Sequence, residues 1–172
     1  MSIAPVVKSV RVKAAPKRAF ELFTSEMGRW WPAGMQIGKS PFVAIVVEPR
    51  PGGRWFERDA EGAECEWGKV MVWEPPTRVL LAWQLNSHFA YDPEFLTEVE
   101  LTFAPAAGGG SIVTVEHRHL ERYGDDAEKI AGLLGALLLQ GCQDRATEGA
   151  AWNAVDDESV HDASSIEEWA SA

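Results

Sequence analysis

The sequence predicts a single α+β domain of the helix-grip type, in which a seven-stranded antiparallel curved sheet wraps around a long C-terminal helix. Three observations predict it. The chain has 172 residues, which suits one domain with one sizeable core. Alternation of apolar and polar residues, with a turn roughly every 12 residues, runs through the middle of the chain. A helical period replaces that alternation after Asp125, and a sheet and a helix that each have one apolar face bury both by packing together.

The N-terminal part begins with a strand and continues with a short helix. From Val6 to Lys13, small and β-branched residues alternate with polar ones, which is typical of a half-buried strand. Pro16 suits the first turn of a helix that we expect to run to about Ser25. The next segment is rich in helix breakers but carries Trp30 and Trp31, so we expect a loop with two large side chains to bury.

Hairpins fill the middle of the chain. Turn signals such as Pro51-Gly52-Gly53 and Gly108-Gly109-Gly110 separate segments of strand character. Six further strands are expected, at Phe42 to Pro49, Arg54 to Asp59, Glu64 to Trp73, Val79 to Leu85, Phe95 to Ala104 and Ser111 to Leu120.

The C-terminal part predicts the long helix and an acidic tail. The helix is expected from about Asp125 to Ala150, with Leu134 and Leu138 on its apolar stripe. The compact domain then covers residues 1–152. Residues 153–172 contain acidic side chains and neither Lys nor Arg, which favours a solvated tail unless Trp169 docks.

Composition excludes several classes of function. The chain has 16 basic and 26 acidic residues, and its net charge of −10 disfavours nucleic acid and anionic membrane surfaces as partners. No membrane-spanning stretch or secretory signal is recognisable, so we expect a cytoplasmic protein. The two cysteines, Cys65 and Cys142, lack the spacing of a zinc site or a redox motif and are expected to be structural thiols.

Several local motifs follow one another in the order of a known superfamily. They are Ala15-Pro16 before Ala19-Phe20, Trp30-Trp31, Pro51-Gly52-Gly53-Arg54-Trp55, Trp67-Gly68-Lys69-Val70, Val79 to Trp83, and the His-containing strand Thr114 to Leu120. Over about residues 5–135 the chain resembles the SRPBCC superfamily, also called START-like or birch-allergen-like. Within it, the chain is similar to the proteins named for the activator of the heat-shock-protein-90 ATPase.

The resemblance implies three functions of different classes. The first is a non-catalytic domain that binds a small apolar or amphipathic molecule between sheet and helix. The second is a protein-interaction module, such as a chaperone ATPase regulator or a stress-response protein, whose partner is a chaperone or a second copy of the chain. The third is a cyclase- or hydroxylase-like enzyme that uses a histidine of the cavity.

The candidate ligand-binding residues are aromatic, imidazole and aliphatic side chains that this architecture brings toward the cavity. The chain contains eight Trp and only two Tyr, and indole offers a large apolar area with one hydrogen-bond donor. The candidates are Trp30, Trp31, Trp55, Met71, Trp73, Trp83, His117, His119, Leu134 and Leu138. Trp30 and Trp31 are favoured as the mouth of the cavity, because loops carry binding residues more often than sheet centres do.

The pair His117 and His119 could place two imidazoles on one face of a strand, about 7 Å apart. A metal site can use such a pair, but no motif supplies a third ligand, so we expect no metal and no cofactor. Either imidazole remains a possible acid or base or a hydrogen-bonded structural group.

Other chemical groups have little support as catalysts. No Gly-x-Ser-x-Gly motif occurs, and the thiolate of Cys65 is expected to be disfavoured by the acidic residues on either side of it. Glu57 shares a strand face with Trp55. If that face points inward, the Glu57 carboxylate needs Arg54, Arg58 or a ligand cation as its partner.

Overall fold

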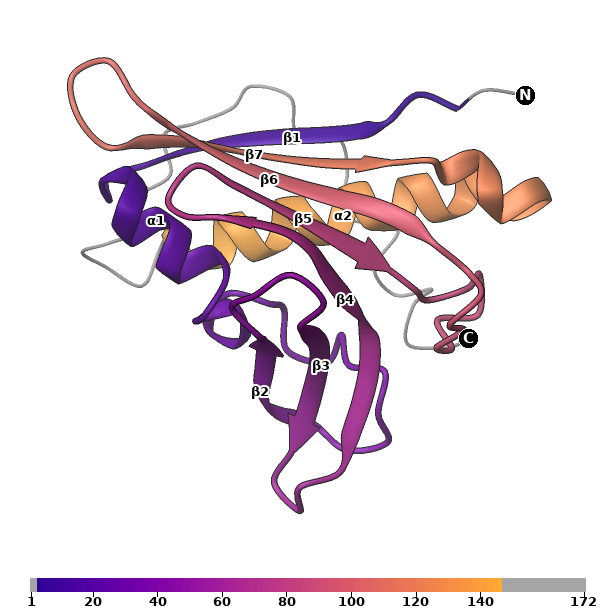
Figure 1. Ribbon diagram of the computed structural model, residues 1–172. Coiled ribbons are helices and arrows are strands. Elements are labelled where there is room, and N and C mark those ends of the chain that lie inside the picture. Colours follow the sequence, from indigo (N-terminus) through magenta and orange to yellow (C-terminus); the bar gives the residue numbers. More distant parts are fainter. Residues whose placement is uncertain (1–2, 147–172) are drawn as a thin grey trace.

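The computed structural model describes residues 3–146, and for residues 137–146 it describes the backbone only. One curled sheet forms one layer, and two helices lie on its concave side (Figure 1). The elements in chain order are β1 (Val6–Val12), α1 (Pro16–Phe23), the 3-10 helix η1 (Met27–Arg29), β2 (Phe42–Val47), β3 (Arg54–Asp59), β4 (Glu64–Glu74), β5 (Arg78–Trp83), β6 (Thr97–Pro105), β7 (Ser111–Arg118), the 3-10 helix η2 (Leu120–Asp126) and α2 (Ala127–Ala146). Among the helices of these residues, none has the length and apolar character needed to cross a membrane.

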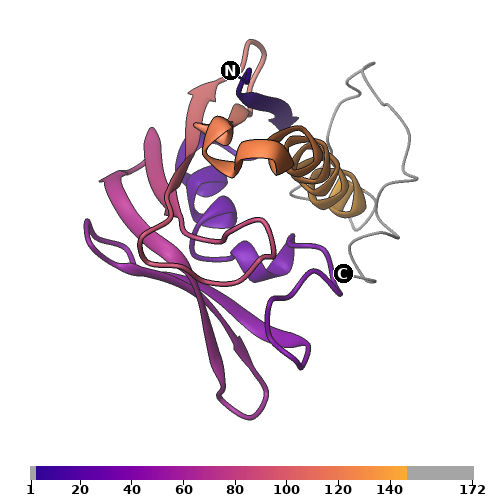
Figure 2. The same cartoon turned by 90° about the vertical axis from the view of Figure 1, so that its right-hand side faces the viewer.

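The sheet confirms the predicted helix-grip architecture. Its strand order is β1-β7-β6-β5-β4-β3-β2, and every neighbouring pair is antiparallel. Strands β2 to β7 form a meander, and β1 joins it at β7. Register shifts interrupt the pairing of β2 with β3, of β3 with β4 and of β4 with β5, and such bulges bend and twist a sheet. Figure 2 shows the resulting curl, with α2 and the segment after α1 on the concave side.

Element boundaries differ from the predicted ones for local reasons. Helix α1 ends at Phe23, two residues earlier than predicted. Strand β5 ends at Trp83, because the following residues form a loop in which Leu85 makes only an isolated bridge to Tyr91. Strand β7 ends at Arg118, where the next residue takes a left-handed backbone conformation. The two 3-10 helices were not predicted. The end of the predicted long helix, residues 147–150, and the acidic tail lie outside the described residues.

Helix α1 covers one end of the concave face with tightly packed rings. Its Phe20 ring lies 5.0 Å from Trp73 in an edge-on arrangement and 5.2 Å from Phe103. Helix α2 packs against β1 and η2 and buries Ile130 and Leu134. The other end of the concave face lies between α2 and the segment that follows α1, and the candidate site is found there.

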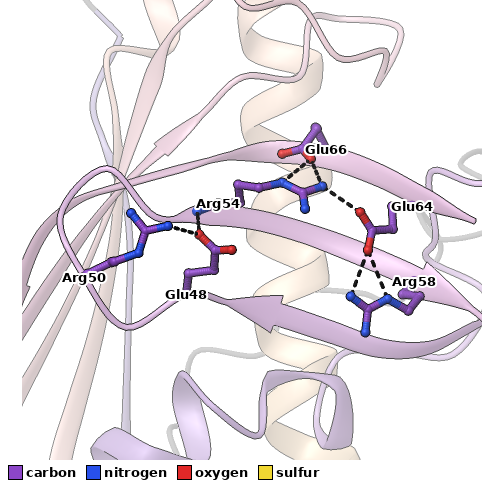
Figure 3. A network of polar contacts seen from close by, with 6 residues as sticks. All are labelled: Glu48, Arg50, Arg54, Arg58, Glu64 and Glu66. Atoms are coloured by element: carbon purple, nitrogen blue, oxygen red, sulfur yellow. Dashed lines mark hydrogen bonds and ion pairs between the residues drawn. The ribbon is translucent and has the colours of Figure 1, made fainter. Parts of the chain in front are cut away.

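The outer face of β3 and β4 carries a network of paired charges (Figure 3). Arg54 donates to Glu66 at 2.7 Å and to Glu64 at 2.8 Å, and Arg58 also donates to Glu64 at 2.8 Å. The Arg54 guanidinium lies 4.0 Å from the centre of the Phe56 ring, which it shields from water. Arg54 and Arg58 therefore belong to the solvent side of the sheet.

Candidate ligand-binding cavity

A cavity of about 30 Å³ lies between the concave sheet face, α2 and the segment after α1. This volume is enough for one or two water molecules but not for a larger ligand. Its walls are Met27, Trp30, Trp31, Trp55, Leu81, Trp83, Val99, Leu101, Val115, His117 and Leu134. Ten of these eleven side chains carry no ionisable group, so the cavity is almost entirely apolar.

Indole rings pack against one another across the cavity wall. Trp67, just behind the wall, lies 4.7 Å from Trp31, 5.5 Å from Trp55 and 6.2 Å from Trp83, measured between ring centroids. Trp30 lies 5.7 Å from Trp31 and also packs against Phe23 of α1. Such ring pairs stabilise beyond their buried area. The rings thus hold the segment after η1 against strands β3, β4 and β5.

The segment after α1 was expected to be a loop that buries two large side chains at the mouth of the cavity. Trp30 and Trp31 are only 4% and 7% exposed, and they follow η1 directly. The indole N–H of Trp31 donates to the carbonyl of Met35 at 2.9 Å, which closes the turn. Both residues do line the cavity, but as part of the core.

The N–H groups of the other four indoles in and behind the cavity wall differ in their partners. The N–H of Trp67 donates to Glu57. The N–H of Trp83 makes no well-formed hydrogen bond, but it interacts weakly with the Tyr123 hydroxyl. The N–H groups of Trp30 and Trp55 are buried and have no hydrogen-bond partner among the described residues.

Glu57 is a buried carboxylate whose partners differ from those predicted. It faces inward and is 3% exposed. Its oxygens accept hydrogen bonds from the backbone N–H of Ile37 at 2.9 Å, of Gly38 at 2.5 Å and from the Trp67 indole at 3.0 Å. The arginines on its own strand point outward instead. A Cβ atom at Gly38 would lie 2.8 Å from the carboxylate, so this close approach requires glycine.

His117 lines the cavity from β7, on the face that alternation predicted for it. Its side chain is 2% exposed, and Nε2 lies 2.8 Å from the Thr97 hydroxyl. Burial lowers the pKa of His117 to about 3. The imidazole is therefore neutral at ordinary pH, and it is a poor general base there because its proton affinity is too low.

His119 does not share this environment, which corrects its expected place beside His117. Its backbone is left-handed, with φ of 65°, so the alternation of β7 ends before it. The ring is 40% exposed and lies 3.5 Å from Glu98 and 3.6 Å from Glu121. The two imidazoles therefore do not form a metal-binding pair. Among residues 3–136, whose side chains the structure describes, no group of three or more His, Cys, Asp or Glu is arranged to hold a metal ion.

Two further candidates on β4 lie outside the cavity wall. The register shifts between Val70 and Val72, which leaves Met71 as the extra residue of a bulge, 36% exposed on the outside. Trp73 does face inward, but it packs against Phe20 of α1 at the other end of the core. Strict alternation along the strand could not reveal the bulge.

On α2, Leu134 lines the cavity as expected. Leu138 lies within the helix, but its side chain is outside the described part of the structure. Sequence reasoning did not name Met27, whose position in a short 3-10 helix gives no periodic signal. Val99, Leu101 and Val115, at alternate positions of β6 and β7, also line the cavity and were not among the predicted ligand-binding residues.

Cys65 is a free, partly buried thiol. Burial raises its pKa, and the charges of Glu57 and Asp59 add to this effect. The predicted direction is therefore confirmed, but the cause is different. The neighbouring residues Glu64 and Glu66 are paired with arginines on the outer face. Cys142 lies where only the backbone is described.

Comparisons with known proteins agree with this architecture. The family model described as activator of Hsp90 ATPase homolog 1-like protein matches residues 13–137. No curated protein matches the chain. Solved structures do. An anthrahydroquino-gamma-pyrone synthase, Txn09, is 36% identical, and the match covers 78% of this chain and 88% of that one with a TM-score of 0.55.

Two more solved structures extend the comparison. CalC, a self-sacrificing resistance protein from Micromonospora echinospora, is 30% identical over 86% of this chain and 97% of that one, with a TM-score of 0.62. The Aha1 dimer from Colwellia psychrerythraea is 14% identical over 80% and 92% of the two chains, with a TM-score of 0.52, and shows the fold alone. Because the family model spans well over half of the sequence, the chain belongs to the family of activator of Hsp90 ATPase homolog 1-like proteins.

Proposed function

We propose that this protein binds a small, largely apolar molecule between its sheet and α2, without transforming it. The observation that carries the proposal is the apolar cavity, whose described wall includes four indoles and one neutral imidazole. Ligand sites of proteins are typically concave and mostly apolar, with few polar groups that orient the ligand. His117, the only titratable group among the described wall residues, is poorly suited to acid–base catalysis.

The size of the cavity adds a condition. About 30 Å³ is far below the roughly 300 to 1,000 Å³ of pockets that hold drug-sized molecules. A ligand of two or three rings therefore enters only if wall side chains move. The segment from Met27 to Met35 and the helix face around Leu134 form the two walls opposite the sheet, and these are the parts that would separate.

Two relatives support a small-molecule role. One is named as a synthase of an anthrahydroquino-gamma-pyrone and is 36% identical, and the other is named as a self-sacrificing resistance protein and is 30% identical. The first name describes the synthesis of a small molecule, and the second describes a resistance function. Both are similar to this chain over most of its length, so a ligand site on the same fold is the simplest common property.

A neutral fluorescent probe, N-phenyl-1-naphthylamine, tests the proposal. The probe gains emission in a dry apolar site, and we expect micromolar affinity, about 8 kcal/mol, with quenching of Trp emission. Trp31→Ala removes a wall side chain and should weaken binding by about 1 to 3 kcal/mol. Trp73→Ala is the matched control, because it truncates a half-buried Trp outside the cavity.

Binding must be expressed per folded molecule, since both substitutions remove ring contacts. Equal affinity for the wild type, Trp31→Ala and Trp73→Ala would place the probe elsewhere on the protein. Absence of any probe binding would contradict the proposal outright.

A second candidate function is an enzyme, and the identity to a synthase favours it. His117 would be the acting group, as a hydrogen-bond partner of the reacting atom. Exchange of the α-protons of 2-tetralone in D₂O, followed by NMR, separates the two functions. An enzyme of this kind accelerates the exchange, and His117→Leu, which removes the hydrogen-bonding group, abolishes the acceleration, whereas a binding domain leaves the rate at the solvent value.

A role as a chaperone regulator or a homodimer draws on the family description and on the dimeric fold neighbour. The latter is 14% identical and supports the fold only. The concave cavity is therefore the better guide to function.

A further inference from the structure

We propose that the ligand of this cavity is an uncharged, flat molecule with oxygen acceptors, which it presents to the indole N–H groups of Trp30 and Trp55. The inference rests on the proposed function and names the chemistry that the site selects. It follows from two independent properties of the wall, its lack of charge and its two unpaired donors.

The wall offers no partner to a charged ligand. Among the described lining residues none is Asp, Glu, Lys or Arg, and burial lowers the pKa of His117 to about 3, so this imidazole is neutral. Glu57 lies behind the wall, but its oxygens are engaged by two backbone N–H groups and the Trp67 indole. A carboxylate or an ammonium group entering the cavity would lose its hydration without gaining an opposite charge.

The same wall offers donors. Trp30 and Trp55 are 4% and 2% exposed, and their N–H groups have no partner among the described residues. Buried N–H groups in proteins are almost always paired, so each exception calls for an explanation. The indole N–H groups of Trp31 and Trp67, in the same cluster, do have acceptors within the protein. The lack of an acceptor is therefore specific to Trp30 and Trp55 and is not a general property of the cluster.

The two donors come from different parts of the chain. Trp30 follows η1, and Trp55 lies on β3. A hydrocarbon in the cavity would leave both N–H groups unpaired, whereas a carbonyl oxygen would accept a hydrogen bond that forms only in the complex. The surrounding rings favour a flat partner, because they offer ring faces and edges.

Fluorene and 9-fluorenone test the acceptor requirement. The two compounds share one three-ring skeleton, and fluorenone has a carbonyl oxygen that fluorene lacks. A third compound, fluorene-9-carboxylate, carries a negative charge on the same skeleton. Titration of Trp emission at about pH 7.5 should show roughly tenfold tighter binding of fluorenone than of fluorene. The carboxylate should bind more weakly than either.

Two variants assign the effect to its donors. Trp30→Phe and Trp55→Phe keep an aromatic wall but remove the N–H, and each should reduce the preference for fluorenone. Trp73→Phe, outside the cavity, should leave that preference intact. In the wild-type protein, the ¹H–¹⁵N signals of the Trp30 and Trp55 indoles should move downfield with fluorenone and not with fluorene, which tests the donors even if a variant fails to fold.

The outcomes separate the two proposals. Equal binding of fluorene and fluorenone, or tighter binding of the carboxylate, overturns this inference but leaves the cavity as a binding site. If none of the three compounds binds, the proposed function fails and the inference fails with it.

Discussion

The two faces of the sheet treat polar groups in opposite ways. On the outer face, arginines and glutamates pair in a continuous network, and Arg54 alone contacts both Glu64 and Glu66 (Figure 3). On the inner face, the polar groups are few and neutral apart from Glu57, and the N–H groups of Trp30 and Trp55 have no partner among the described residues. The charged groups of this outer network are paired with one another, whereas two buried donors of the inner face are not paired with any described residue.

This difference determines how strongly substitutions on each face should affect stability. Paired charges in water contribute little individually, and any one of them can be replaced at small cost. A buried polar group cannot hydrogen-bond to water, so the free energy of burying it depends on whether the protein supplies a partner. Substitutions on the inner face should therefore have large effects and those on the outer face small ones, and each prediction below tests one side of this comparison.

The largest expected effect is that of Leu134→Asp on the inner side. Leu134 is 2% exposed and lines the cavity, and a carboxylate there would face only apolar groups and a neutral imidazole. We expect a loss of about 3 to 5 kcal/mol in the free energy of unfolding, measured by urea denaturation. Lys129→Asp, on the exposed side of the same helix, is the control. A melting temperature within a degree of wild type for Leu134→Asp would show that α2 does not seal the cavity.

Glu57→Ala should have the next largest effect. It leaves the N–H groups of Ile37, Gly38 and Trp67 without their acceptor, and buried unpaired donors destabilise by about 1 to 3 kcal/mol each when they cannot reach water. Partial rehydration of the Ile37-Gly38 segment reduces the sum, so we expect about 3 kcal/mol in total.

The matched control is Glu66→Ala on the outer face of β4. It removes a carboxylate that contacts Arg54 in water and should change the free energy of unfolding by only a small fraction of the Glu57→Ala effect. Similar losses for the two variants would contradict the difference between the faces.

The burial of His117 should make the stability of the protein depend on pH. Burial lowers its pKa from 6.5 to about 3, so below about pH 6.5 the unfolded chain binds a proton that the folded protein does not. Stability therefore falls as the pH drops, by about 2 kcal/mol between pH 8 and pH 5 from this residue alone. The surface glutamates whose pKa is lowered, such as Glu26 and Glu100, lose their contribution only below about pH 4.5.

The change is measured by denaturation at several pH values. His117→Gln can still hydrogen-bond to Thr97 but does not titrate, and its stability should vary less between pH 8 and pH 5. An unchanged pH dependence in this variant would mean that the imidazole is not buried as described.

The fold could be predicted because its signals are local and repeated. Alternation predicted the strands of the sheet, and the helical period identified Leu134. Alternation gives the wrong face where a strand has a bulge, because one extra residue shifts the following side chains to the opposite face. Met71 was predicted to point inward for this reason, but it lies on the outside of the sheet. The prediction for His119 was wrong for a similar reason, because the left-handed backbone of His119 itself ends the alternation of β7.

The partners of buried groups were beyond sequence reasoning. An inward-facing Glu57 was expected to need Arg54, Arg58 or a ligand cation as its partner. Its partners are instead backbone N–H groups about 20 residues earlier and an indole on the next strand. Opposite charges near in sequence suggest pairs, whereas a backbone donor carries no sequence signature. The unpaired N–H groups of Trp30 and Trp55 likewise depend on the closure of the whole cavity.

The smallest expected effect is that of Glu64→Gln on the outer face. Glu64 receives hydrogen bonds from Arg54 and Arg58, which hold its pKa below the usual value. After the substitution Arg54 keeps Glu66, Arg58 turns to water, and the amide still accepts a hydrogen bond. We expect the melting temperature to change by about two degrees or less, and by even less in about 1 M salt, where the wild-type pairs are screened. A drop as large as that of Glu57→Ala, or one that persists in high salt, would show that the charged network on the outer face supports the sheet as strongly as the buried carboxylate does.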